Sequence, residues 1–275
     1  MGSLDALSTA TSGLLAQSAA LENVSGNVAN AQTTAFKATD TAFDDLVSQS
    51  QVSETVLWRS VLTNGRAGVI VAGAADTDMA INGDGYFTVK APTGVSASGQ
   101  PTFGASNTVY SRRGDFTLDS GGYLVNGAGD CLMGQPIDPV TKATSAQVQL
   151  LQFDTTTEVP GLGILQSLSV SSSGRLQGTY SKGQTVDVAS LPVATFRGQG
   201  FMSQGDGGTF AATPESGEAQ YLGASTVVGN ALEASNVDVQ DQMITMVQAQ
   251  QAYSVGSKVI TTANEMMLTL TNLTI

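Results

Sequence analysis

The string Asn82-Gly83-Asp84-Gly85 carries oxygen ligands at a spacing that could bind a cation. Calcium loops of this kind place a bidentate glutamate at the twelfth position. Counting from Asn82, that position holds Thr93. Asn-Gly and Asp-Gly are also typical turn pairs. We therefore interpret the string as a turn and predict no metal ligand there.

Two charged pairs and one cysteine are the other candidates for chemistry. Asp44 and Asp45 could act as acid and base, but neighbouring residues on a helix or strand point apart. Arg112 and Arg113 could hold a phosphate, yet a single basic pair in a chain of net charge −12 is more typical of a salt-bridged surface. Cys131 is interpreted as a small core residue, and a lone cysteine excludes an intrachain disulfide.

The chain contains no histidine among its 275 residues. Histidine is the commonest general base and metal ligand, so its absence removes every Ser-His and Cys-His arrangement. No glycine loop continues into the Gly-Lys-Ser/Thr of a phosphate-binding loop. We predict no catalytic residue, no cofactor and no metal, and conclude that the chain is not an enzyme. A hydrolase is the alternative, and it would need a carboxylate whose replacement abolishes turnover.

Charged residues make up only 12% of the chain, about half the usual share of ~25%. Small uncharged residues take their place, which suits close packing against other subunits. The acidic balance disfavours nucleic acid and anionic membranes as partners. No apolar run reaches the ~20 residues of a membrane span, and the N-terminus lacks the features of a cleaved signal peptide, so we expect no membrane insertion. A secreted β-rich protein with a polar surface is the alternative.

Both ends of the chain predict helices with a seven-residue apolar repeat, as in coiled coils. The N-terminal helix covers residues 4 to about 30, and the C-terminal helix runs from about 236 to 273, with Ser235 or Asn236 as its cap. In the N-terminal helix the repeat consists of Leu7, Leu14, Leu21 and Val28, with Leu4, Thr11, Ser18 and Ser25 in the partner position. In the C-terminal helix it consists of Val239, Met246, Tyr253, Ile260 and Met267, accompanied by Ala249, Gly256, Ala263 and Leu270.

Between the helices, short alternating segments and glycine-rich turns predict an antiparallel β-rich body. Residues 38 to 64 fit neither pattern, and we interpret them as an extended connector with a helical patch at 43–47. The expected strands are 79–81, 86–89, 116–118, 123–125, 148–151, 168–170 and 191–196. The expected fold is α+β, with paired, coiled-coil-like terminal helices enclosing the β-rich domain. Its segments are an N-terminal helical segment (1–37), a connector (38–74), the β-rich body (75–225) and a C-terminal helical segment (226–275).

Each terminal helix has an apolar line but too little bulk to bury it alone, and helices gain most of their stability from packing. We therefore expect the two ends to pair with each other and then with neighbouring subunits; a two-helix hairpin on a monomer is the alternative. Asn23, Asn27 and Asn30 share one helical face although asparagine is a poor helix former. Amide contacts between helices could fix their register, and an exposed polar face is the other interpretation.

At these residues the sequence resembles the flagellar hook and rod protein family. The stretch from Ser25 to Lys37 is similar to the family signature Asn-(Ile/Leu)-Ala-Asn-x-x-Thr-x-Gly-(Phe/Tyr)-Lys, with Ala35 in place of the glycine. Alanine would strain a left-handed turn, so we expect a different local backbone there. Residues 78–89, 110–126 and 232–260 resemble three further family blocks in the same order. Gln251 stands where the family usually has arginine.

The resemblance implies a structural subunit that is exported unfolded by the flagellar type III apparatus, with an uncleaved N-terminal signal, and located in the hook or basal body. It implies a helical homopolymer whose terminal helices line the tube, with neighbouring axial proteins and the hook cap or rod cap as further partners. The hook-like stretches at 132–136 and 178–196 favour a compact hook protein that transmits torque to the filament; a distal or proximal rod protein is the alternative. A secreted β-rich binding or adhesion module with a helical stalk is the alternative from another class.

Overall fold

A computed structural model of the chain describes residues 3–48, 51–95, 101–104, 107–171, 173–221 and 225–273. The chain divides into two compact units. Unit 1 comprises residues 1–31, 37–63 and 237–275, and unit 2 comprises residues 32–36 and 64–236. The chain therefore passes from unit 1 into unit 2 twice, and each unit is described by itself.

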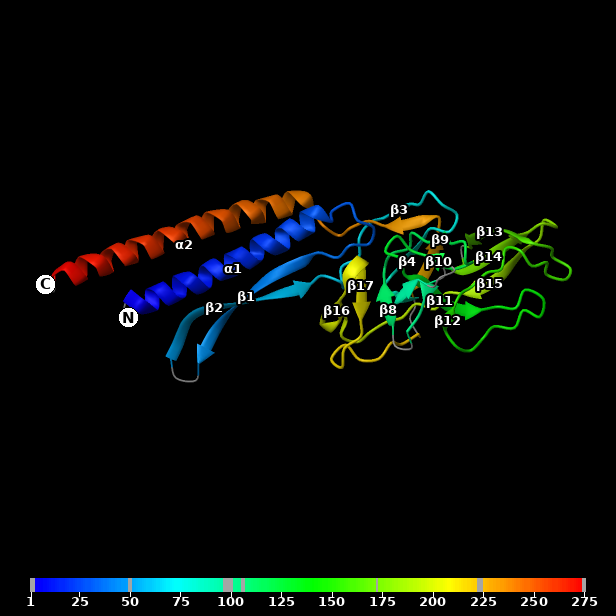
Figure 1. Cartoon of the computed structure of the whole chain (residues 1–275), viewed down its shortest axis with the longest axis horizontal. Coiled ribbons are helices and arrows are strands. Elements are labelled where there is room, and N and C mark those ends of the chain that lie inside the picture. Colours follow the sequence, from blue (N-terminus) through cyan, green and yellow to red (C-terminus); the bar gives the residue numbers. More distant parts are fainter. Residues whose placement is uncertain are drawn as a thin grey trace. The chain divides into compact units, whose positions relative to one another are not determined.

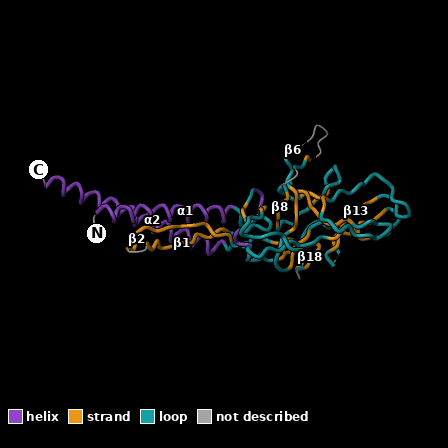
Figure 2. Tube along the Cα trace, turned by 90° about the horizontal axis from the view of Figure 1, so that it is seen from below, coloured by secondary structure: helices purple, strands orange, loops and turns teal. Residues whose placement is uncertain are grey.

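Unit 1 consists of two helices and a long β hairpin. Helix α1 (Ser3–Ala29) and helix α2 (Val239–Leu273) lie side by side and run in opposite directions (Figures 1 and 2). Strands β1 (Thr39–Ser48) and β2 (Gln51–Leu62) pair in antiparallel fashion and pack on α1. The helical patch expected at 43–47 is wrong, because these residues belong to β1 and pair with β2.

Unit 2 is β-rich, as the sequence predicts, and its largest sheet has eleven strands, eight of them in the order β13-β14-β15-β11-β5-β8-β17-β16. Its core is a single apolar cluster that includes Phe87, Phe116, Leu132 and Leu176. The strands are β3 (Ile70–Ala72), β4 (Met79–Asn82), β5 (Phe87–Lys90), β6 (Gly94–Val95), β7 (Pro101–Thr102), β8 (Thr108–Ser111), β9 (Thr117–Leu118), β10 (Leu124–Val125), β11 (Cys131–Pro136), β12 (Gln149–Leu150), β13 (Leu165–Val170), β14 (Arg175–Tyr180), β15 (Thr185–Ser190), β16 (Ser203–Gln204), β17 (Thr209–Ala211), β18 (Thr226–Gly229) and β19 (Ala231–Glu233), with 3-10 turns at Gln199–Phe201 and Asp206–Gly208.

Three local expectations are corrected. The strand expected at 191–196 is reduced to two isolated bridges, at Ala194 and Thr195. The cap of α2 is Asp238 rather than Ser235 or Asn236, because its Oδ1 accepts the Gln240 amide at 2.9 Å. Ala35 does adopt the left-handed backbone, with φ of 55°. Its amide donates to the Glu233 carbonyl oxygen at 2.8 Å, which helps offset a strain of about 1–2 kcal/mol.

The residues considered for chemistry have structural roles. Gly83 and Gly85 both have positive φ, consistent with a turn at 82–85. Cys131 is buried in β11, and burial raises the pKa of its thiol to about 11. Asp44 is exposed and paired with Arg59 at 3.1 Å. Within the described ranges, no group of His, Cys, Asp or Glu side chains could hold a metal ion, and neither helix is long and apolar enough to span a membrane.

Candidate assembly interface

The buried face of α1 is built from small residues. Ala16, Ala20, Val24 and Asn27 are buried, one helical turn apart, and face the rest of unit 1. The predicted line of Leu7, Leu14, Leu21 and Val28 lies beside this face and is half-buried. The hydroxyl residues of the expected partner line, Thr11, Ser18 and Ser25, are exposed within the single chain. The small residues let α1 approach its neighbours closely.

Helix α2 buries an equally small line. Ala249 and Ala263 are buried, and Gly256 lies between them. A Cβ added to Gly256 would stand 3.0 Å from Leu14 Cδ2 of α1, so the glycine permits close contact between the helices. Of the predicted repeat, Met246, Ile260 and Met267 are half-buried, whereas Val239 and Tyr253 are 42% and 44% exposed. The side chain of Leu270 lies outside the described residues.

Asn23 and Asn27 of α1, and Asn30 directly after its end, hold different partners. Asn27 is buried; its Oδ1 accepts the Thr39 amide at 2.9 Å, and its Nδ2 donates to Thr39 O and to Gln242 Oε1 of α2, both at 3.0 Å. Asn23 Nδ2 donates to Thr41 Oγ1 at 2.7 Å and to Ser60 Oγ at 3.1 Å. Asn30 donates back to Gly26 O of α1. Asn23 and Asn27 therefore attach the β hairpin to α1, and Asn27 also bridges the two helices.

Replacing Asn27 with alanine should destabilise unit 1 by about 2–4 kcal/mol, because the half-buried Thr39 amide loses its acceptor and Gln242 loses its donor. Thermal unfolding followed by the fluorescence of Trp58, which lies on β2, measures the change. Ser25→Ala is the matched control, since Ser25 is exposed on the same helix. A loss below about 0.5 kcal/mol in Asn27→Ala would contradict this role.

The outward side of α2 carries an apolar strip that the seven-residue repeat did not predict. Its members are exposed although they are large and apolar. They are Met243, Ile244, Val247, Val255, Val259, Met266 and Leu268. Exposed apolar patches of this kind mark interaction sites. The sequence carries these apolar residues outside the seven-residue repeat, and no single helical line connects them.

A buried ion pair inside unit 2 holds the segment through which the chain leaves this unit. Arg112 Nη1 lies 2.9 Å from Glu233 Oε2, and the two side chains are 3% and 1% exposed. The surface location expected for the arginine pair is therefore wrong for Arg112. Its Nε also donates to Gly85 O at 2.8 Å and its Nη2 donates to Gly83 O, so it braces the 82–85 turn. This role, rather than cation binding, explains the glycine-rich string.

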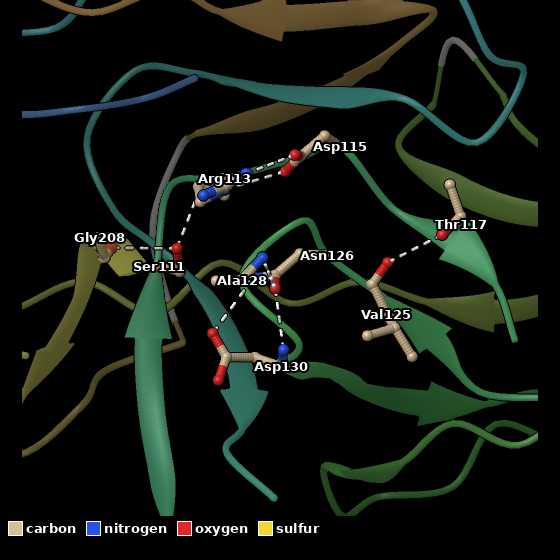
Figure 3. A network of polar contacts seen from close by, with 9 residues as sticks. All are labelled: Ser111, Arg113, Asp115, Thr117, Val125, Asn126, Ala128, Asp130 and Gly208. Atoms are coloured by element: carbon tan, nitrogen blue, oxygen red, sulfur yellow. Dashed lines mark hydrogen bonds and ion pairs between the residues drawn. The ribbon is translucent and has the colours of Figure 1, made fainter. Parts of the chain in front are cut away.

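Figure 3 shows two further groups of polar contacts, one around Arg113 and one in the β10–β11 turn. The Arg113 guanidinium forms a bidentate salt bridge with Asp115, in which Nη2 donates to Oδ2 at 2.7 Å and Nε donates to Oδ1 at 3.2 Å. In the turn, Asn126 Oδ1 accepts the amides of Ala128 and Asp130. Burial raises the pKa of the Asp130 carboxyl above its usual value, although the Asn126 hydrogen bond and the charge of Arg113 act in the opposite direction.

Asp130→Asn should increase the free energy of unfolding at pH 7. A raised native pKa means that the charged carboxylate destabilises the folded state, and that protonation at lower pH removes this cost. The gain should therefore shrink as the pH falls through the raised pKa. Asp154→Asn is a control of opposite sign, because hydrogen bonds from Thr156 and Thr157 lower the pKa of Asp154. Urea unfolding at pH 7 and pH 4 tests both; an Asp130→Asn gain that grows on acidification would contradict the argument.

Comparisons with known proteins agree with this architecture. Residues 228–273 match the family of flagellar basal body rod FlgEFG protein C-terminal segments, and residues 80–178 match the flagellar hook protein FlgE/F/G D1 domain. The chain is 26% identical to the flagellar basal-body rod protein FlgG of Bacillus subtilis over 276 residues, covering 92% of each chain. It is 27% identical to FlgG of Caulobacter vibrioides over 292 residues, covering 96% of this chain and 97% of the relative.

A hook protein is also similar, over a shorter stretch. The flagellar hook protein FlgE of Brucella abortus is 37% identical over 135 residues, which is 47% of this chain and 31% of that protein. A D1-type domain in the β-rich unit, followed by a C-terminal family segment that contains α2, defines the class. The chain belongs to the family of flagellar hook and rod proteins. It is a structural, non-enzymatic subunit of the flagellar axis, and such subunits assemble with themselves and with neighbouring axial proteins.

Proposed function

We propose that this chain is a rod-type subunit of the basal body that polymerises helically through its terminal helices. The observation that carries the proposal is the full-length similarity to rod proteins, which covers 92% of both chains in the Bacillus subtilis relative. Similarity to the hook protein of Brucella abortus spans only 31% of that protein. A rod subunit would connect the envelope-embedded motor to the hook.

A compact hook subunit that transmits torque to the filament is the second candidate. It is supported by the higher identity to a hook protein, 37% over 135 residues. Deleting the gene and imaging purified basal bodies by electron microscopy separates the two. A rod that stops inside the envelope supports the rod subunit, whereas a finished rod without a hook contradicts it and supports the hook subunit.

The interface that we propose combines the coiled-coil-like seam between the helices with the outward strip of α2. Its seam residues are Leu7, Leu14, Leu21, Asn23, Asn27, Val28, Asn30, Val239, Met246, Tyr253, Ile260, Met267 and Leu270. Burial of Ala16, Ala249 and Ala263 and the close approach of Leu14 to Gly256 support pairing along this seam. The exposed strip around Met243 and Val247 is then free to pack against neighbouring subunits.

Met243→Gln/Val247→Gln should weaken polymerisation without unfolding the chain. Both side chains are more than half exposed, so the monomer loses little packing. Burying each against a neighbour contributes about 1–2 kcal/mol, and the double change should raise the critical concentration at least about tenfold. Sedimentation of the assembled fraction measures this concentration. Val140→Gln, at an equally exposed position of unit 2, is the control. An unchanged critical concentration would remove the strip from the interface.

We also propose the remaining partners of an axial subunit, namely the flagellar export apparatus and a rod or hook cap, with export through an uncleaved N-terminus. The similarity of the terminal segments to the family signature supports this. Mass spectrometry of subunits from purified flagella tests the uncleaved N-terminus: a peptide beginning at the first residues supports it, and a trimmed N-terminus contradicts it.

A further inference from the structure

In unit 2 the incoming segment (Gln32–Phe36) and the outgoing segment (Glu233–Asn236) are hydrogen-bonded to each other. The Ala35 amide donates to Glu233 O at 2.8 Å, and the Asn236 amide donates to Phe36 O at 3.2 Å. Asn236 Nδ2 also donates to Arg66 O at 3.1 Å. The outgoing segment therefore lies beside the incoming one. Along the chain, the incoming segment follows the end of α1 by a few residues, and the outgoing segment precedes the start of α2 by a few residues.

Apolar burial does not explain the register of the outgoing strand, because β19 buries Ala231 and the charged Glu233 and leaves Leu232 half-buried. Strand β19 pairs only with the three-residue β3, with Glu233 opposite Ile70 and Leu232 opposite Val71. Ile70 and Val71 are 40% and 47% exposed. A slip of one residue would exchange the two faces of β19 and bury Leu232 in place of Glu233, so apolar burial does not oppose the slip.

The polar contacts of the Glu233 side chain favour the observed register. Its Oε1 accepts the Gly68 amide at 2.7 Å and its Oε2 accepts from Arg112 Nη1 at 2.9 Å. Arg112 is itself held by the carbonyl oxygens of Gly83 and Gly85. A slip of one residue would place Leu232 or Ala234 opposite Arg112 and leave a buried charge without its partner. Buried ion pairs add little net stability compared with apolar packing, and a documented use of buried polar groups is to specify register.

We propose that Arg112 and Glu233 are positioning residues for assembly. They fix the register at which the outgoing segment joins the incoming one, and through the short connections they fix the register at which α2 begins beside α1. A shift of one residue turns a helix face by about 100°. Gly256 would then no longer face Leu14, and the outward strip of α2 would point elsewhere. This inference rests on the proposed polymerisation through the terminal helices.

The test compares Arg112→Met/Glu233→Met with the wild-type chain. Replacing both partners removes both charges of the buried pair, so the double variant should lose less stability than Arg112→Met alone, although the Gly68 amide and the carbonyl oxygens of Gly83 and Gly85 lose their partners. Amide exchange of Ala35 and Asn236 should become at least tenfold faster relative to β14, and seeded polymerisation at least tenfold slower. Arg175→Met/Asp187→Met is the control, because it removes an exposed pair of the same chemistry in unit 2. Unchanged exchange, or unchanged polymerisation, would overturn the proposal.

Glu233→Asp provides a second variant if the double variant does not fold. It keeps the charge but shortens the side chain, so one carboxylate can no longer reach both the Gly68 amide and Arg112. Exchange at Ala35, normalised to β14, should again rise at least tenfold, and an unchanged rate would contradict the proposal. A wild-type chain that fails to polymerise would refute the proposed function, whereas the exchange measurement still decides the role of the pair.

Discussion

Replacing Arg112 alone with methionine should lower the free energy of unfolding of unit 2 by about 3–5 kcal/mol, because it removes the guanidinium that pairs with the buried Glu233 carboxylate. The carbonyl oxygens of Gly83 and Gly85 lose their donors as well. Urea unfolding followed by far-ultraviolet circular dichroism measures the loss. Such a loss would exceed a third of the stability of many single domains.

Arg175→Met is the matched control for Arg112→Met. Arg175 pairs with Asp187 at 3.2 Å on the surface of the same unit, with 53% of its side chain exposed. Exposed pairs contribute at most about 1 kcal/mol. If Arg112→Met lowers the free energy of unfolding no more than Arg175→Met does, the buried ion pair does not stabilise unit 2.

Gly114→Ala should prevent normal folding of unit 2 or destabilise it by at least about 3 kcal/mol. A Cβ at this position would stand 1.5 Å from the carbonyl oxygen of Met79, which is backbone and cannot rotate away. The approach is close because the Met79 amide donates to Gly114 O at 3.0 Å. The methyl group would therefore separate β4 from the segment that follows β8.

Soluble yield and thermal unfolding measure the effect of Gly114→Ala, with Gly200→Ala as the control. An added Cβ at Gly200 meets no atom within 4 Å, and the residue does not have a positive φ. Gly200→Ala should therefore change stability by less than about 1 kcal/mol. If Gly114→Ala has the same melting temperature as Gly200→Ala, the close packing of these two segments is contradicted.

The terminal helices could be predicted from sequence because each repeats apolar residues over many turns without proline. The observed bounds, Ser3–Ala29 and Val239–Leu273, lie within a few residues of the expected ones. The hairpin β1–β2 could not be predicted in the same way. Its strands depend on pairing with each other and on contact with α1, and such tertiary contacts override local pattern. Phe43 of β1, for example, lies opposite Trp58 of β2, beyond the window of any local helix or strand pattern.

In the candidate interface, too, some features could be predicted from local sequence pattern and others depend on contacts between distant residues. The spacing of Asn23 and Asn27 indicated a special face, and the structure gives both side chains specific partners on β1. The role of Arg112 was hidden, because its partner Glu233 lies 121 positions away and no local pattern connects them. The family resemblance singled out both stretches without giving the reason for either residue.

The central claim is that this chain is an axial subunit that polymerises through its terminal helices. Electron microscopy of the concentrated full-length protein, beside Met243→Gln/Val247→Gln at the same concentration, tests it most directly. We expect helical tubes from the wild-type chain, with the terminal helices on the inside, and dispersed monomers from the variant. A wild-type chain that stays monomeric at every concentration, with both terminal helices resistant to limited proteolysis, would contradict it.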